Sequence, residues 1–221
     1  MRTANRFMPL LVIGAAVMFA RAPFMIYDAP MESTMGLIQK IFYFHVPAAS
    51  ATFLAAAVCG IASAMFLWRR SPAADHVAVS AAELAVVFGI IVLATGPLWA
   101  RKAWGIWWQW DVRLTMTLVM WMVFVAYLLL RRFGGPGSEV LAAAVGLFGM
   151  ALVPFIYISV NYWRTIHPTT NVVPSLPPEM AAPFWWSMVA FVLLFAAILI
   201  VRVRLESSRA ALEDAYAALE D

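Results

Sequence analysis

Six long apolar stretches, separated by short polar segments, organise the whole chain. They lie at about 8–26, 41–68, 78–98, 114–130, 139–158 and 183–203. Each is close to or above the ~20 residues with which an α-helix crosses a bilayer, and the second is long enough to tilt or to lie partly at the interface. The pattern predicts an all-α integral membrane protein with six transmembrane helices over 1–203.

The last residues, 204–221, change abruptly to a charged composition that favours a helix. Leu205, Leu212 and Leu219 recur at seven-residue intervals. This pattern is typical of a solvated helix, and one stripe over two heptads also leaves a docking helix for a partner open. We therefore expect a short cytoplasmic C-terminal helix after the membrane domain.

Composition supports lipid as the solvent for most of this surface. Hydrophobic residues make up 64% of the 221 residues and charged residues only 12%, which is roughly half the charged share of a soluble domain. This excludes a soluble enzyme. The net charge of +3 is explained by basic loops rather than by nucleic-acid binding. Cys59, the single cysteine, lies inside a predicted span and is expected to pack as a small hydrophobe.

Basic residues in the connecting segments predict the orientation. One set contains nine of them: Arg2, Arg6, Arg69, Arg70, Arg131, Arg132, Arg202, Arg204 and Arg209. The other contains six: Arg21, Lys40, Arg101, Lys102, Arg113 and Arg164. The richer set is expected to be cytoplasmic, which puts both termini inside and the segments 27–40, 99–113 and 159–182 outside. The start of the chain loosely resembles a signal peptide, but the length of its apolar run favours an uncleaved first span.

The second external segment is rich in tryptophan and reads WGIWWQWDVRLT from residue 104 to residue 115. Four of the ten tryptophans fall within seven positions, whereas an aromatic belt usually supplies one or two per span end. If the segment is helical, Trp104, Trp107, Trp108 and Asp111 share one face and form a platform for a planar ligand. Spacing alone leaves the platform and a structural belt equally open.

Two of the three histidines lie on the same side as the tryptophan segment. His45 begins the second span, His167 lies in the last external segment, and His76 lies in a cytoplasmic loop, where an exposed surface histidine explains it. A lone histidine at a span end is usually an interfacial hydrogen-bonding residue. Two neutral imidazoles can, however, fill both axial positions of a haem iron, whereas tetrahedral zinc needs further ligands. The pair favours haem over zinc.

Several basic residues are unexpected on the outside under the charge rule. They are Arg101, Lys102, Arg113 and Arg164. Arginine binds carboxylates in bidentate fashion, so these residues could hold haem propionates. Anchoring to lipid headgroups, or pairing with Asp111 and Glu179, explains them equally well.

Taken together, these residues resemble the CcmC family of haem-handling membrane proteins of cytochrome c maturation. The matching stretches are the WWD segment at 104–115, Phe-His-Val-Pro-Ala-Ala at 44–49 and Trp-Arg-Thr-Ile-His at 163–167, and the resemblance covers nearly the whole chain. It implies that His45 and His167 are the axial ligands of haem b. It also implies a haem-binding external domain, over about 99–115, that includes Trp104, Trp107, Trp108, Trp110 and Asp111.

The resemblance further implies a function and its partners. The protein is expected to bind haem at the periplasmic face of the bacterial inner membrane and to deliver it to the haem chaperone CcmE. Its other expected partners are CcmA, CcmB and CcmD, with membrane lipid around the helices and no nucleic acid. It is expected to be a binding and delivery protein, not an enzyme.

Two other functions compete with haem delivery. A permease subunit of an ABC-type transporter, exporting haem or another substrate, would need a partner for ATP hydrolysis, because no segment resembles a Walker A loop. Few polar residues lie inside the predicted spans, which argues against a hydrophilic translocation path. An electron-transfer cytochrome with two haems would need four ligands, and only two histidines are external.

Overall fold

The computed structural model describes residues 2–220, with the side chains of 7–219, so the side chains of Arg2 and Arg6 lie outside the described part. Its elements are α1 (Arg2–Asp28), the short 3-10 helix η1 (Leu37–Ile41), α2 (Phe42–Arg69), α3 (Pro72–Trp104), α4 (Val112–Phe133), α5 (Ser138–Ser159) and α6 (Pro178–Glu220). Six of these helices are long and apolar enough to cross a membrane. The predicted all-α fold with six spans is confirmed.

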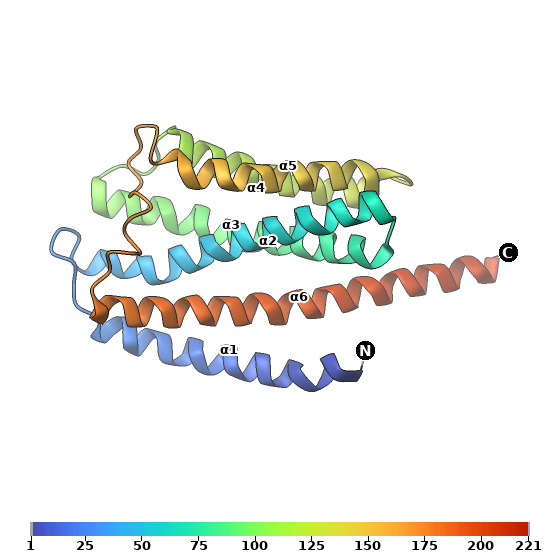
Figure 1. Ribbon diagram of the computed structural model, residues 1–221, viewed down its shortest axis with the longest axis horizontal. Helices are drawn as coiled ribbons and strands as arrows, with labels where there is room; N and C mark the ends of the chain where they lie inside the picture. Colours follow the sequence, from blue (N-terminus) through green and yellow to red (C-terminus); the bar gives the residue numbers. More distant parts are fainter. Residues whose placement is uncertain (1, 221) are drawn as a thin grey trace.

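The helices run antiparallel in an elongated bundle (Figure 1). Helix α1 packs along α6, α2 packs against α3 and α5, and α4 packs beside α5. Both termini lie at one end, and the connections 29–36, 105–111 and 160–177 gather at the opposite end (Figure 1). The three segments that were expected on one side of the membrane therefore share one end of the bundle.

Helix α3 extends beyond the predicted span at both ends. Ser71 caps its start by accepting a hydrogen bond from the Ala74 N–H at 3.4 Å, and Pro72 occupies the first turn. The helix continues through Pro97 to Trp104 and stops at Gly105, whose φ of 76° is a left-handed conformation that favours glycine.

The single face that Trp104, Trp107, Trp108 and Asp111 would share in a helix does not form, because α3 stops at Gly105. After Gly105, residues 106–110 form an irregular connection, and α4 begins only after Asp111. The aspartate is the N-cap of α4, because its Oδ1 accepts a hydrogen bond from the Leu114 N–H at 2.8 Å. Gly105 and Asp111 thus confine Trp107, Trp108 and Trp110 to the connection between α3 and α4, whereas Trp104 ends α3.

The C-terminal residues continue α6 without a break, so the expected boundary at 204 falls inside one helix of 43 residues. The last turns project from the bundle (Figure 1). Leu205, Leu212 and Leu219 are exposed there, as a helix that leaves the membrane region would place them.

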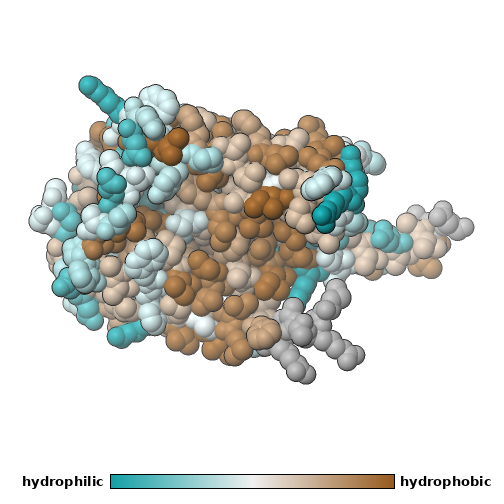
Figure 2. Space-filling model, in the orientation of Figure 1, coloured by the Kyte–Doolittle hydropathy of each residue, from teal (hydrophilic) through white to brown (hydrophobic). Residues whose placement is uncertain are grey.

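Several fully buried residues of α2 and α3 have small side chains, among them Ala55, Ala56, Ala81 and Ala82. The free thiol of Cys59 is also buried, as was predicted, and lies close to Gly146 of α5. Between membrane helices the hydrophobic effect contributes little, so close backbone approach through small residues supplies the packing energy. The face of the bundle shown in Figure 2 is apolar in a band between two polar ends.

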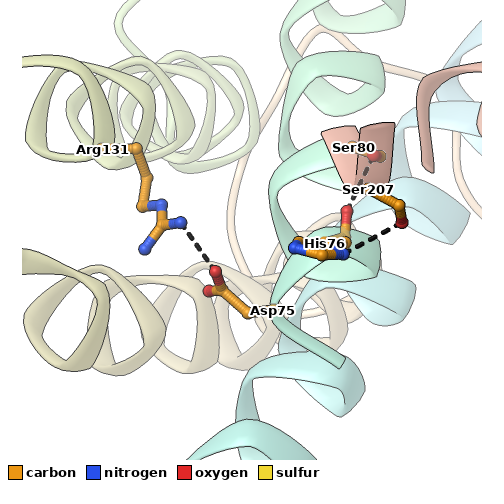
Figure 3. A network of polar contacts seen from close by, with 5 residues as sticks. All are labelled: Asp75, His76, Ser80, Arg131 and Ser207. Atoms are coloured by element: carbon orange, nitrogen blue, oxygen red, sulfur yellow. Dashed lines mark hydrogen bonds and ion pairs between the residues drawn. The ribbon is translucent and has the colours of Figure 1, made fainter. Parts of the chain in front are cut away.

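Ionic and polar contacts tie the helices together at the end that holds the termini. Arg131 of α4 donates to Asp75 of α3 at 2.6 Å, and the His76 Nδ1 lies 3.0 Å from the Ser207 hydroxyl of α6 (Figure 3). Arg202 forms an ion pair with Glu83. The prediction of an exposed surface histidine at 76 is wrong, because this ring is half-buried and fastens α3 to α6.

Candidate functional site

Two adjoining cavities lie at the end of the bundle where the long connections gather. The first, between α2, α3, α4 and the 160–177 connection, is narrow and partly open to the surroundings. The second, between η1, α2, the same connection and the start of α6, is the larger of the two. His45, Trp99, Arg113 and His167 line both cavities. The two histidines thus belong to a shared wall.

His45 lies in the first turn of α2 and is buried, with 7% of its surface exposed. Its Nδ1 lies 2.8 Å from the hydroxyl oxygen of Thr95 on α3. The Trp99 ring meets the imidazole edge-on, with 5.6 Å between the ring centroids. At Gly96 an added Cβ would lie 3.4 Å from the His45 Cε1. Three neighbouring positions of α3 therefore hold this ring.

His167 lies in the 160–177 connection rather than on a helix. Its Nδ1 is 2.8 Å from the carbonyl oxygen of Pro168. A carbonyl can only accept, so Nδ1 carries the proton and donates, which leaves a lone pair on Nε2. Burial, together with the positive charge of Arg113, lowers the pKa of His167 to about 3, so the ring is neutral near pH 7.

Asp111 links the tryptophan segment to the connection that carries His167. Its Oδ2 accepts hydrogen bonds from the Thr165 hydroxyl at 2.5 Å and from the Ile166 N–H at 3.3 Å. The Thr165 oxygen in turn accepts from the His167 N–H at 3.0 Å. Asp111 is not among the residues that line the two cavities. It was predicted as a haem-binding residue, and its contacts are those of a support for His167.

The tryptophans of the WWD segment fall into two groups. Trp104 and Trp108 line the first cavity, and Trp104 stacks on Trp99 with 6.1 Å between ring centroids. Trp107 and Trp110 are 57% and 75% exposed and line neither cavity. The irregular connection after Gly105 breaks the expected single face. Two of the four indoles face the cavity side and two face outward.

Trp99 is a site residue that the sequence reasoning missed. It lines both cavities and is the first residue of the external segment predicted at 99–115, but it was not among the tryptophans named for haem binding. The signal that could have found it is its place one turn after Thr95 and Gly96 on the same helix.

Of the three arginines predicted to contact the ligand, only Arg113 lines the cavities within the described part of the chain. Its Nη1 donates to the carbonyl oxygens of Ile156 and Tyr157 at 3.1 and 3.2 Å. A guanidinium carries five N–H donors, so it can still bind a carboxylate. Arg101 donates to the Gly105 carbonyl and stacks over Trp107, and Arg164 is exposed.

The residues present fit a haem. Two imidazoles, cavity-lining indoles and one arginine match the iron, the flat ring and the propionates of that ligand. The Trp108 Nε1 is buried without a hydrogen-bond partner on the wall of the first cavity, so a donor is available for an acceptor on a ligand. Among the side chains of residues 7–219, no cluster of three His, Cys, Asp or Glu could bind a metal ion by itself.

Fold and site together define a six-helix membrane protein with a histidine pair and a tryptophan wall at one end. A sequence model of the family described as Heme exporter protein C (CcmC) matches residues 1–217. The chain belongs to this family of membrane proteins that handle haem in cytochrome c biogenesis.

Individual relatives agree with this assignment. The chain is similar to Heme exporter protein C of Bradyrhizobium diazoefficiens, with 33% identity over 210 residues, 92% of this chain and 80% of that protein. It is also 33% identical over 183 residues to the protein of that name from Escherichia coli K12, covering 80% and 73% of the two chains. A putative cytochrome c biosynthesis ccmC-like mitochondrial protein of Marchantia polymorpha is 28% identical over 182 residues, 81% and 78% of the two chains.

Proposed function

We propose that this chain binds haem b between His45 and His167 and delivers it to the haem chaperone CcmE. The observation that carries the proposal is that imidazoles from α2 and from the 160–177 connection line the same two cavities. Bound haem supplies an iron whose two axial positions these rings would fill. The single cysteine is buried in α2, which supports a haem held without thioether bonds.

The other site residues have distinct roles in this proposal. Arg113 would neutralise a propionate, and Trp104 and Trp108 would contact the macrocycle from the first cavity. Trp107 and Trp110 present exposed indoles beside that cavity, and large exposed aromatic groups are typical of protein contact sites. These two tryptophans would meet CcmE, while CcmA, CcmB and CcmD would contact the helices.

The haem site is proposed to face the periplasm across the bacterial inner membrane, with both termini in the cytoplasm. The excess of arginine at the end that holds the termini supports this orientation. It can be tested with Trp110→Cys and Tyr216→Cys, because the natural Cys59 is buried. A membrane-impermeant maleimide applied outside the inner membrane should label the first variant and not the second. The reverse pattern would overturn the orientation.

The ligand assignment is tested by purifying the protein in detergent with its haem. His45→Ala and His167→Ala should each lose the absorbance spectrum of a six-coordinate low-spin haem. His76→Ala is the matched control, because that ring lies at the opposite end and contacts Ser207. A haem spectrum unchanged by both His45→Ala and His167→Ala would refute the proposal.

A further inference from the structure

We propose that Thr95 is a positioning residue that fixes His45 with its proton on Nδ1 and its Nε2 lone pair directed to the ligand. The inference rests on the proposed function, because it takes His45 as an axial haem ligand. Thr95 lies in α3 and is absent from the lining of both cavities. It can therefore act on the haem only through the imidazole.

The direction of the hydrogen bond follows from the second partner of the Thr95 hydroxyl. Its oxygen lies 2.7 Å from the carbonyl oxygen of Ile91, one turn earlier in the same helix, and 2.8 Å from the His45 Nδ1. A hydroxyl has one proton, and a carbonyl oxygen can only accept. If the Thr95 hydroxyl donated its proton to His45, the Thr95 and Ile91 oxygens would lie 2.7 Å apart with no proton between them. The hydroxyl therefore donates to Ile91 and accepts from the imidazole.

A neutral imidazole that donates from Nδ1 has its lone pair on Nε2, which is the form that binds a metal. Metal-binding histidines usually hold this tautomer by donating their other N–H to an oxygen. His167 obtains the same form from the Pro168 carbonyl. A hydroxyl oxygen on a helix and a carbonyl oxygen in a connection thus favour the same tautomer in the two rings.

The neighbours of Thr95 fix the plane of the same ring. Gly96 leaves space for the His45 Cε1, and Trp99 packs edge-on against the imidazole. Packing alone would allow a ring flip that exchanges Nδ1 and Cδ2, since the two orientations have nearly the same shape. Only a directional hydrogen bond distinguishes them, and Thr95 supplies it. The hydroxyl group of Thr95, rather than the size of its side chain, therefore fixes the orientation of the His45 ring.

The tautomer can be measured directly in the haem-free protein. The chain has three histidines, so nitrogen-15 labelling of histidine gives few signals, and His45→Gln assigns one ring. We expect Nδ1 of His45 to be protonated and Nε2 to be unprotonated near pH 7. In Thr95→Val the two tautomers should mix while the His76 signals stay in place, which shows that the fold is intact. A His45 protonated on Nε2, or a tautomer unchanged in Thr95→Val, would overturn the inference.

Haem affinity gives a second, independent measurement. Loss of an outer-shell partner typically lowers metal affinity about 10- to 100-fold, and Thr95→Val should do so with a shift towards five-coordinate haem. Thr95→Ser keeps the hydroxyl and should retain the haem affinity and the absorbance spectrum of the natural protein. Ser80→Ala is the matched control, because Ser80 also lies in α3 and also donates to the carbonyl four residues earlier at 2.7 Å.

The outcomes separate the two proposals. Equal weakening in Thr95→Val and Thr95→Ser, or unaltered affinity in Thr95→Val, would overturn the positioning role while His45 remains a ligand. A haem spectrum that does not respond to His45→Ala would overturn the proposed function, and the role of Thr95 in it would fall as well.

Discussion

Replacing Asp111 by asparagine should weaken haem binding although this side chain lines neither cavity. The carboxylate has two tasks, since Oδ1 caps α4 through Leu114 and Oδ2 holds Thr165 and Ile166. Asparagine is as good an N-cap as aspartate, so the start of α4 can be retained. Its amide nitrogen would then face the Ile166 N–H and the Thr165 hydroxyl, and the support of the His167 connection would be lost.

The size of the effect follows from the hydrogen bonds involved. A hydrogen bond to a charged group contributes about 1.5–3 kcal/mol, and a buried donor left without an acceptor costs about 1–3 kcal/mol. Asp111 is itself buried, with 7% of its surface exposed, so water offers little compensation. Because about 1.4 kcal/mol corresponds to a tenfold change in an equilibrium constant, we expect haem affinity to fall about 10- to 100-fold in Asp111→Asn.

The assay is haem titration of the purified protein in detergent, combined with a double-mutant cycle. If Asp111 acts through His167, the Asp111→Asn effect should disappear in the His167→Ala background, and Thr165→Val should mimic it without adding to it. Unaltered affinity in Asp111→Asn would refute the reasoning. A full effect that persists in His167→Ala would show instead that the carboxylate acts elsewhere.

Three further outcomes are expected. Trp108→Ala should reduce haem retention in the purified protein. Trp110→Ala, at an exposed indole, should retain haem but slow its transfer to CcmE. Equal loss of haem in both variants would contradict the division of the tryptophans into cavity-lining and exposed groups. Gly146→Ala would place a Cβ 2.7 Å from the Ser63 hydroxyl, so we expect about 1–3 kcal/mol of destabilisation, read as a lower unfolding temperature in detergent; an unchanged temperature would disagree. Glu83→Gln removes the charge that Arg202 binds through two hydrogen bonds, and the two side chains are only 29% and 34% exposed. We expect a destabilisation of about 1–3 kcal/mol, read as a lower unfolding temperature, with haem affinity unaltered.

The six spans could be predicted from sequence because lipid imposes a simple rule. Every backbone polar group inside a bilayer must be paired, so a long apolar stretch has to be a helix. The helix ends were harder to predict. Periodicity suggested a helix across 104–111, and the left-handed backbone at Gly105 prevents it. Glycine tolerates such a conformation without requiring it, so the stop depends on how the segment packs.

The candidate site was predicted by residue type and only partly by geometry. His45, His167, Trp104, Trp108 and Arg113 all line the first cavity. The residues that position these side chains could not be predicted, because their contacts join positions that are far apart in the chain. Thr95 lies 50 residues from His45, and Thr165 lies 54 residues from Asp111. No local pattern marks a threonine that accepts from a histidine on another helix.

Under the proposed delivery function, the unequal supports of the two imidazoles bear on how the haem is released. His45 is held by a helix turn packed against α3, whereas His167 is held by a connection that depends on the Asp111–Thr165 contact. Connections with few buried contacts open at lower free energy than packed helices do. His167 should therefore dissociate from the haem first when an acceptor competes for it, while His45 still holds the haem. In the proposed delivery, a firmly held His45 and a less firmly held His167 would let the same site bind haem tightly and still pass it on.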